Sequence, residues 1–365
     1  MKFLMFLCLY MLAHNFLAVL YLKAAALVLR RKKSSPGPEV KKVSVIMPVY
    51  NEQECIVRKM ENLLACFTHI NRPCEVLIGS DGSTDDTPRQ VEAFIREHHL
   101  DGWRLVAFEK QGKGPTINQL VLGSAGDLII STDADTQMAP EAMESIVKAF
   151  EEDVGLGCLS STPQYDGRDM TIQSCYWKYE LSFRDAASHL GRLVVATGWL
   201  YAFRKDAFRD IPASAMADDL WVPLTVLLQG KKSMHLKGLK ALSEFTDDHV
   251  EVKRRTRVIT GGFDVVKRLF PEIIKKPDLF FVVFSHKINR WLLPVWVVVF
   301  ILASLIINVR AAFIYGILLA VLVGVLSPKR CYYLLYSVFS PVLSAVQFVA
   351  RKDFSKWDHT RKKTE

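Results

Sequence analysis

Acidic side chains follow two apolar segments in the first half of the chain. Asp133 and Asp135 form an Asp-x-Asp directly after the apolar run that ends at Thr132, and Asp81 follows an earlier run. Two carboxylates at this spacing suit one hard cation, because Mg²⁺ and Mn²⁺ bridge carboxylate and phosphate oxygens. An Asp-x-Asp is also common in solvated loops and helix caps, so each motif alone leaves an ordinary turn as the alternative.

A glycine-rich basic loop and an acidic pair extend this set. Lys113 lies in the loop Lys110–Gly114, whose flexible backbone and lysines suit phosphate contact. The loop lacks the Walker spacing and equally fits a surface turn. Asp218 and Asp219 precede an apolar helix expected over residues 220–228. One of the two is expected to cap that helix, which leaves the other to act as a base.

Two arginines lie further along the chain, on a helix expected to begin near Glu251. Arg254 and Arg257 are three residues apart and therefore share one face of that helix. Two guanidinium groups on one face are able to grip a diphosphate leaving group. A basic helix that faces a membrane surface is the alternative.

These residues lie at the ends of short β-branched runs that alternate with helical patterns. The predicted strands are 43–49, 75–80, 104–108, 127–132 and 157–161, and the predicted helices are 52–67, 87–98, 116–122 and 140–150. This alternation predicts an α/β fold with a mainly parallel sheet that is covered by helices on both faces. Such sheets bind ligands at the carboxyl ends of their strands, and the first strand leads there into Pro48, Tyr50, Asn51 and Glu52.

The amino-terminal segment predicts a membrane anchor. Residues 3–29 are apolar apart from interruptions such as His14, Asn15 and Lys23, and a bilayer crossing takes about 20 residues. The basic cluster 30–33 follows the segment, which places the next domain in the cytoplasm. A signal peptide is the alternative, but the apolar stretch is too long and the basic cluster follows it instead of preceding it.

The carboxyl-terminal region is also apolar. Residues 291–308 and 311–326 predict a tight helical hairpin, and 332–350 predicts a third crossing, a re-entrant helix or an interfacial helix. The expected layout is an amino-terminal transmembrane helix over 1–30, a basic linker over 31–41, a cytoplasmic domain over 42–276, a membrane region over 277–350 and a basic tail over 351–365.

Composition narrows the class of partner. The net charge of +9 arises largely from short basic runs beside the apolar stretches, a pattern that suits anionic lipid headgroups. Because no aromatic-basic recognition motif appears, we expect no nucleic-acid partner. The seven cysteines show no metal-binding spacing, which favours reduced thiols in a cytoplasmic domain.

Taken in order, the motifs resemble the family-2 glycosyltransferases. The landmarks are residues 48–52, residues 80–85, the Lys-Gly loop, the Asp-x-Asp, the segment 197–204, the acidic pair and the arginine-rich helix. The resemblance covers about residues 42–262, and the membrane-flanked layout is similar to the bacterial synthase-like branch. It implies a GT-A, Rossmann-like domain with transmembrane helices at both ends, and a nucleotide-diphosphate sugar bound with Mg²⁺ or Mn²⁺.

The resemblance also implies a role for each matching residue. Asp81 would contact the nucleobase and Asp133 the nucleotide, Asp135 together with Asp133 would ligate the metal, and Asp219 beside Asp218 would be the catalytic base. The remaining residues expected in the nucleotide-sugar site are Pro48, Tyr50, Asn51, Glu52, Lys113, Arg254 and Arg257.

One departure from the family pattern concerns product length. Arg254 and Val258 stand where processive members carry the Gln and the Trp of Gln-x-x-Arg-Trp. We therefore expect inverting transfer from a UDP-sugar to a membrane-associated lipid or glycan acceptor at the cytoplasmic membrane. Three alternative functions remain: a processive synthase of the same fold, a membrane-bound nucleotidyltransferase, and a binding protein without turnover. The partners that remain open are a second copy of the chain, in a homo-oligomer, and an export partner.

Overall fold

The computed structural model describes residues 2–29, 34–165, 173–243, 248–307, 340–346 and 348–350. These residues form two compact units. The sheet unit holds 34–165, 187–243 and 248–272, and the helical unit holds 2–29, 173–186, 273–307 and the described residues between 340 and 350.

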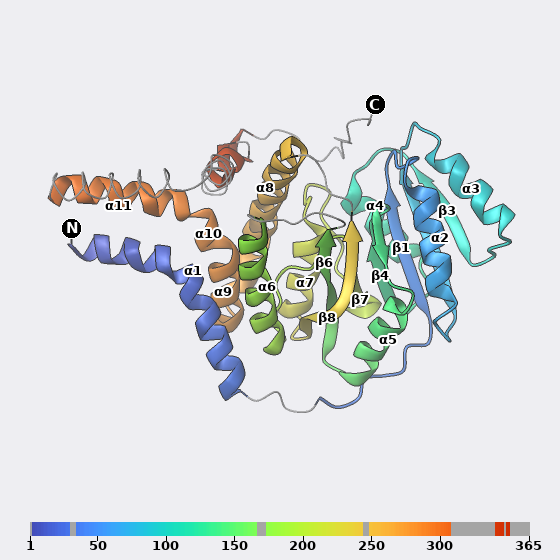
Figure 1. Cartoon of the computed structure of the whole chain (residues 1–365), viewed down its shortest axis with the longest axis horizontal. Coiled ribbons are helices and arrows are strands. Elements are labelled where there is room, and N and C mark those ends of the chain that lie inside the picture. Colours follow the sequence, from blue (N-terminus) through green and yellow to red (C-terminus); the bar gives the residue numbers. More distant parts are fainter. Residues whose placement is uncertain are drawn as a thin grey trace. The chain divides into compact units, whose positions relative to one another are not determined.

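The sheet unit contains one mixed sheet (Figure 1). Its strands are β1 (Val43–Val49), β2 (Cys74–Asp81), β3 (Trp103–Phe108), β4 (Leu128–Thr132), β5 (Thr136–Met138), β6 (Leu156–Tyr165), β7 (Leu200–Arg204) and β8 (Lys232–Ser243). Their order is β3-β2-β1-β4-β7-β6-β8-β5. The first four strands in this order are parallel, and β7 runs antiparallel to both β4 and β6.

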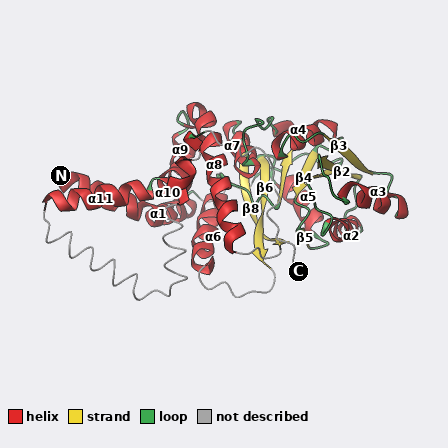
Figure 2. Cartoon of the chain, turned by 90° about the horizontal axis from the view of Figure 1, so that it is seen from above, coloured by secondary structure: helices red, strands yellow, loops and turns green. Residues whose placement is uncertain are grey.

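Helices cover both faces of this sheet, as Figure 2 shows. On one side lie α4 (Lys113–Gly123) and α7 (Asp218–Leu228), and on the other lie α2 (Ile56–Phe67), α3 (Thr87–Glu97) and α5 (Ala142–Glu152). The helix α8 (Asp248–Ile273) follows β8. The prediction of an α/β sheet with helices on both faces is therefore confirmed.

Buried apolar strands explain why the central part of the sheet forms. Every residue of β1 and of β4 is buried, which is the pattern of parallel strands covered on both faces. The core cluster combines alternate residues of β1, such as Val43, Val45 and Met47, with the apolar face of α2. Exclusion of these side chains from water is the main force that holds the strand ends in place.

The elements that were not predicted include β5, β7, β8 and α6 (Gln173–His189). Strand β7 is the one that matters for the site. It is inserted antiparallel beside β4, so that Thr132 pairs with Leu200. The segment that leads into β7 therefore lies at the carboxyl edge of β4, where the Asp-x-Asp begins.

The helical unit contains α1 (Lys2–Val28), α6 as far as Ala186, α9 (Pro277–Val283), the π-helical turn η2 (Phe284–Ile288), α10 (Asn289–Trp291) and α11 (Leu293–Ile307). Helix α1 has two different faces. Asn15, Ala18 and Leu22 are buried, whereas Phe16 and Leu20 are largely exposed. One face therefore packs on the other helices of this unit, and the opposite face presents apolar side chains.

The polar interruptions of the amino-terminal apolar run have buried partners within the helical unit. His14 Nε2 lies 2.9 Å from Ser285 Oγ, and Asn289 Nδ2 donates to the carbonyl of Met11 (2.9 Å) and to Asn15 Oδ1 (3.3 Å). Polar groups on apolar helices commonly face the interior of a bundle in this way. These contacts join α1 to η2 and α10.

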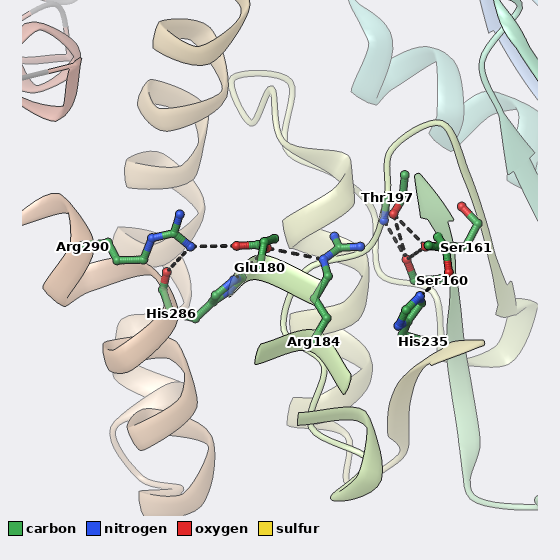
Figure 3. A network of polar contacts seen from close by, with 9 residues as sticks. Ser160, Ser161, Glu180, Arg184, Thr197, His235, His286 and Arg290 are labelled. Carbon is green, nitrogen blue, oxygen red and sulfur yellow. Dashed lines mark hydrogen bonds and ion pairs between the residues drawn. The ribbon is translucent and has the colours of Figure 1, made fainter. Parts of the chain in front are cut away.

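A charged cluster joins α6 to η2 and α10. Glu180 accepts from His286 Nε2 (2.9 Å) and Arg290 Nη1 (2.8 Å), and Arg184 Nε lies 3.4 Å from the same carboxylate. Figure 3 shows Glu180 between the two arginines. The Glu180 side chain is 7% exposed, so its charge is stabilised by these three partners and not by water.

Among the described residues, α1 is the one helix that is long and apolar enough to cross a membrane by itself. A second span results only if the pair 277–291 and 293–306, which is bent by 63°, is counted as one broken helix. Of the predicted hairpin, the first helix corresponds to α11, and 311–326 lies outside the described residues. Of the predicted third segment, 332–339 and Gln347 also lie outside them. The described residues therefore support one membrane crossing, and the prediction of several crossings is not supported.

Candidate active site

The carboxyl ends of β1, β2 and β4 bring the predicted residues to one edge of the sheet. Because β1 pairs in parallel with both β2 and β4, these strands end at the same edge of the sheet, at Val49, Asp81 and Thr132. The start of antiparallel β7 reaches this edge too, and the carbonyl of Trp199 accepts from Asp133 N at 3.1 Å. The site is therefore built from four neighbouring strands.

Asp81 is fully buried and organises the basic loop. Its Oδ1 accepts from Gln111 N (2.8 Å) and Thr116 Oγ1 (3.3 Å), and both of its carboxylate oxygens lie 3.1 Å from Gly112 N. Gly112 has φ +102°, a conformation that favours glycine, and it directly precedes α4. Asp81 thereby fixes the loop that carries Lys113, and its predicted contact with a nucleobase stays a prediction.

The loop after β1 interlocks with the loop after β2. Asn51 adopts φ +53°, which asparagine tolerates better than most residues. Its side chain accepts from Thr84 N (2.8 Å), and its backbone N–H donates to Ser83 Oγ (3.1 Å). Glu52 N–H donates to Thr87 Oγ1 at 2.8 Å. The two loops thus form one rigid wall of the site.

Two other predicted residues of this wall differ in their exposure to solvent. Pro48 is buried within β1, whereas Tyr50 is partly exposed and the ammonium group of Lys110 lies over its ring. A cation over an aromatic face is attracted by the ring quadrupole. Tyr50 therefore offers its ring at the edge where the basic loop begins, and Pro48 shapes the strand beneath it.

Lys113 connects the two acidic motifs. Its Nζ lies 2.9 Å from Asp133 Oδ1 and 3.5 Å from Asp218 Oδ1. Burial by itself would lower the pKa of Lys113, but the attraction of Asp133 and Asp218 outweighs burial and raises it above the ordinary lysine value. The side chain therefore carries a fixed positive charge between the Asp-x-Asp and the start of α7.

The two aspartates at the start of α7 have different surroundings. Asp218 is buried and accepts from Tyr201 OH at 2.9 Å, in addition to its contact with Lys113. Burial and the adjacent Asp218 carboxylate raise the pKa of Tyr201, so Tyr201 keeps its proton and donates it. Asp219 is partly exposed. Ala217 occupies the N-cap position, so the prediction that one of these aspartates caps the helix is wrong.

A short segment before β7 borders Asp219. Ala196 N–H donates to the backbone carbonyl of Asp219 at 2.7 Å, and a Cβ at Gly198 would lie 3.6 Å from the Cβ of Asp219. Thr197 anchors the segment, because its backbone N–H donates to Ser160 Oγ (2.8 Å) and its hydroxyl to the carbonyl of Ser161 (2.8 Å), as Figure 3 shows. This segment therefore links the Asp-x-Asp to the start of α7.

The donor atoms of the Asp-x-Asp fit a hard divalent cation. Asp133 and Asp135 are both partly exposed carboxylates at the edge of the sheet. Within the described part of the chain there is no group of three His, Cys, Asp or Glu side chains that could hold a metal by themselves. Two carboxylates suit Mg²⁺ or Mn²⁺ when phosphate oxygens and water complete the shell, as is usual for Mg²⁺.

The two predicted arginines follow β8 in the chain. Arg254 and Arg257 both lie on α8, and Arg257 is partly exposed, whereas the side chain of Arg254 lies outside what is described. Sequence reasoning missed Tyr201, whose hydroxyl holds Asp218. Tyr201 lies within the segment 197–204 that the family resemblance had singled out, although not for this contact.

The mixed sheet with helices on both faces, and with the predicted residues at the carboxyl ends of β1, β2 and β4, agrees with a GT-A fold. Residues 44–212 match the family model described as glycosyl transferase family 2. This match, over just under half of the chain, supports a family-2 glycosyltransferase, and the predicted α/β fold of the GT-A type is confirmed.

Curated relatives cover only part of the chain. An undecaprenyl-phosphate 4-deoxy-4-formamido-L-arabinose transferase of Serratia proteamaculans is 33% identical over 113 residues, which are 31% of this chain and 35% of that protein. A chondroitin synthase of Escherichia coli is 26% identical over 206 residues, or 54% of this chain and 29% of that protein. The chain thus spans about a third of the length of the curated relatives that it matches.

A solved structure has a similar fold over nearly the whole chain. The mannosyltransferase PcManGT of Pyrobaculum calidifontis, in complex with GDP-Man and Mn²⁺, has a TM-score of 0.72 and 21% identity, and the similarity covers 96% of this chain and 100% of that one. At this identity the likeness concerns the fold alone.

Proposed function

We propose that this chain transfers a sugar, with inversion, from a nucleotide-diphosphate sugar to a membrane-associated acceptor. The observation that carries the proposal is the bridge made by Lys113. One partly buried cation contacts both the Asp-x-Asp and the acidic pair of α7, which supports a diphosphate site and a base at one edge of the sheet. A UDP-sugar is the donor we expect, and a lipid or glycan hydroxyl is the acceptor.

The proposed division of labour follows from the surroundings of each group. Asp219 accepts the proton of the acceptor hydroxyl as its oxygen attacks the anomeric carbon. The bond from that carbon to the diphosphate oxygen breaks, and its electron pair leaves with the nucleoside diphosphate. Lys113 offsets the charge that grows on the leaving group, with Arg257 as a second candidate cation. No covalent enzyme intermediate is required.

Asp133 and Asp135 would hold a divalent cation together with the diphosphate oxygens. A bound Mg²⁺ or Mn²⁺ would supply further neutralisation of negative charge on the diphosphate. Two observations support this assignment. Both carboxylates are partly exposed, and the mannosyltransferase with a similar fold was solved in complex with Mn²⁺. Metal dependence itself is part of the proposal.

The membrane association of the acceptor rests on the helical unit. Helix α1 presents exposed apolar side chains along one face, and basic residues follow it at 30–33. Apolar helices and adjacent cationic runs suit a bilayer and its anionic headgroups. The curated transferases named after undecaprenyl phosphate agree with an acceptor carried on a lipid.

The test is a panel of nucleotide sugars incubated with the purified full chain, Mn²⁺ and a lipid extract of the host. The readouts are the nucleotide released and the size of the glycosylated product, with EDTA as the control. We expect one donor to yield a nucleoside diphosphate and a product extended by one or a few sugars. Pyrophosphate release would instead identify a nucleotidyltransferase, a long polymer a processive synthase, and the absence of turnover with any donor a binding protein.

A further inference from the structure

A lysine on α2 is completely buried beneath the Asp-x-Asp loop. Lys59 has no exposed surface, and its Nζ donates to Thr132 Oγ1 at 2.9 Å and to the carbonyl of Thr136 at 2.6 Å. Thr132 directly precedes the Asp-x-Asp and Thr136 directly follows it. One ammonium group therefore holds both ends of the loop that carries the two carboxylates.

Two further side chains of α2 contact the residues that follow the Asp-x-Asp loop. Asn62 Nδ2 donates to the carbonyl of Met138 (2.8 Å), and Met138 N–H donates to Asn62 Oδ1 (3.1 Å). Cys66 Sγ lies 3.5 Å from the carbonyl of Ala139. Positions 59, 62 and 66 are spaced by three and four residues, so they form one stripe of the helix. The stripe follows residues 132–139 from the end of β4 to the end of β5.

Stability alone does not account for a lysine at this position. Burial lowers the pKa of Lys59 to about 8, against the attraction of Cys66, Asp133 and Asp135, so the charged form is unfavourable in the folded protein. Apolar side chains of similar volume often replace buried charges at no cost, or with a gain, in stability. A methionine would fill this space without the cost of desolvation.

We infer that Lys59 is a positioning residue for the metal and diphosphate site. It holds Thr132 and Thr136 so that the carboxylates of Asp133 and Asp135 point to one place, although it touches neither metal nor substrate itself. The inference rests on the proposed function, because it assumes that these two carboxylates hold a cation together with a nucleotide diphosphate. Residues that orient metal ligands from behind typically change metal affinity by about 10- to 100-fold when they are lost.

A direct charge effect has to be separated from the effect of position. The positive charge of Lys59 repels a metal ion and attracts a diphosphate, so either affinity alone would mix the two effects. The ratio of the nucleotide Kd in EDTA to that in saturating Mn²⁺ avoids this difficulty. It measures how much each ligand favours the binding of the other. To a first approximation, the attraction of Lys59 for each ligand cancels from this ratio, whereas the geometry of the loop does not.

The experiment compares the full-length wild type with Lys59→Met by calorimetric titration of UDP and, separately, of GDP, in Mn²⁺ and in EDTA. We expect the ratio to fall by about tenfold or more in Lys59→Met while thermal unfolding remains cooperative. Lys148→Met is the matched control, because Lys148 is exposed on α5 and its side chain is 72% accessible. Its ratio is expected to equal that of the wild type.

Thr132→Val tests the same contact from the side of the loop. It removes the hydroxyl that accepts from Lys59 while the branched shape of the side chain is kept, and it is expected to lower the ratio as well. A ratio equal to that of the wild type in folded Lys59→Met would overturn the inference and leave the proposed function standing. If Lys59→Met does not fold, the same result in Thr132→Val would overturn it. Failure of the wild type to bind either nucleotide more tightly in Mn²⁺ would overturn both.

Discussion

Lys113 explains how two acidic motifs coexist at one edge of the sheet. Asp133 follows β4 and Asp218 begins α7, and their mutual repulsion would be considerable without a cation between them. Lys113 contacts both of them at 2.9 and 3.5 Å. A diphosphate that enters the site would meet the same lysine, so the contacts that order the site without ligand are suited to exchange for contacts with the substrate.

The base assignment gives a prediction at the residue scale. Asp219→Asn is expected to lower the transfer rate by about 10² to 10⁴, because the amide does not accept the acceptor proton. Nucleotide binding measured by titration should change little. The rates are compared in single-turnover assays of wild type and variant.

The neighbouring Asp218→Asn is the informative comparison for this prediction. Asp218 is buried against Tyr201 and Lys113, so its loss is expected to disturb binding as well as rate. A near wild-type rate in Asp219→Asn would contradict the role of Asp219 as the base. It would point instead to an acceptor that is already anionic, such as a lipid phosphate, which has no proton to lose.

The buried Lys59 predicts a pH dependence of stability. Its pKa of about 8 in the folded protein lies below the ordinary lysine value of about 10.4, so between these pH values the unfolded chain binds more protons than the folded chain. Stability therefore rises with pH in this window, and the cost of the charge, about 3 kcal/mol at pH 7, is removed by about pH 10.5.

Thermal unfolding at pH 7 to 10 tests this dependence by comparison with Lys59→Met. The other titrating groups are shared by the two proteins, so the difference between their midpoints reports the lysine. We expect the wild type to gain several degrees relative to the variant as the pH rises. A constant difference across this range would show that Lys59 is not shifted as described.

At the scale of elements, the central strands could be predicted because each is an apolar run between polar loops. The predicted strand 43–49 has the same bounds as β1, and the predicted helix 87–98 differs from α3 by one residue. Strand β5 has only three residues, and β7 and β8 lack a distinctive alternation of apolar and polar residues. Their positions depend on which neighbour they pair with, and local sequence does not specify that.

The residues of the candidate site, like the strands, could be predicted only in part. Strand-end acids could be found because parallel strands bring their carboxyl ends together. The contact of Tyr201 with Asp218 could not be found, because it requires β7 to be inserted antiparallel beside β4. The role of Lys59 was hidden too, since a lysine in a helix normally predicts an exposed face.

Glu180 gives a prediction for the packing of helices in the helical unit. Glu180→Gln removes the charge that compensates Arg184 and Arg290, and loss of one partner of a buried pair typically costs about 3 to 5 kcal/mol. We expect a marked fall in the unfolding midpoint in detergent micelles.

The control for this prediction is Glu152→Gln on α5. Glu152 pairs with Lys148 at 4.0 Å and its side chain is 66% exposed, so its loss should cost less than about 1 kcal/mol. Equal effects of the two substitutions would show that the Glu180 cluster adds nothing beyond an ordinary surface pair.

At the scale of the whole molecule, the sequence separates a sheet unit of ordinary polarity from strongly apolar helices. Basic residues stand at both junctions, at 30–33 and at Lys275 and Lys276. Basic residues next to membrane segments favour the cytoplasmic side. We therefore predict that the sheet unit is cytoplasmic and that the amino terminus is outside.

Labelling of an introduced cysteine tests this orientation. In Glu92→Cys the thiol lies on the exposed face of α3, and a membrane-impermeant maleimide should label it only after lysis. The parent protein measures labelling of the native cysteines, of which Cys55, Cys66 and Cys158 are buried in the sheet unit. Labelling of Glu92→Cys in intact cells would place the sheet unit outside.

The central claim is glycosyl transfer, and the fate of the β-phosphate of the donor tests it most directly. The donor that is consumed in the panel is prepared with ¹⁴C in the sugar and ³²P in the β-phosphate, and the products of one turnover are separated. Cleavage between the anomeric carbon and the diphosphate oxygen predicts all ¹⁴C in the acceptor and all ³²P in the nucleoside diphosphate. Recovery of ³²P together with ¹⁴C in the acceptor, or release of pyrophosphate, would contradict the account.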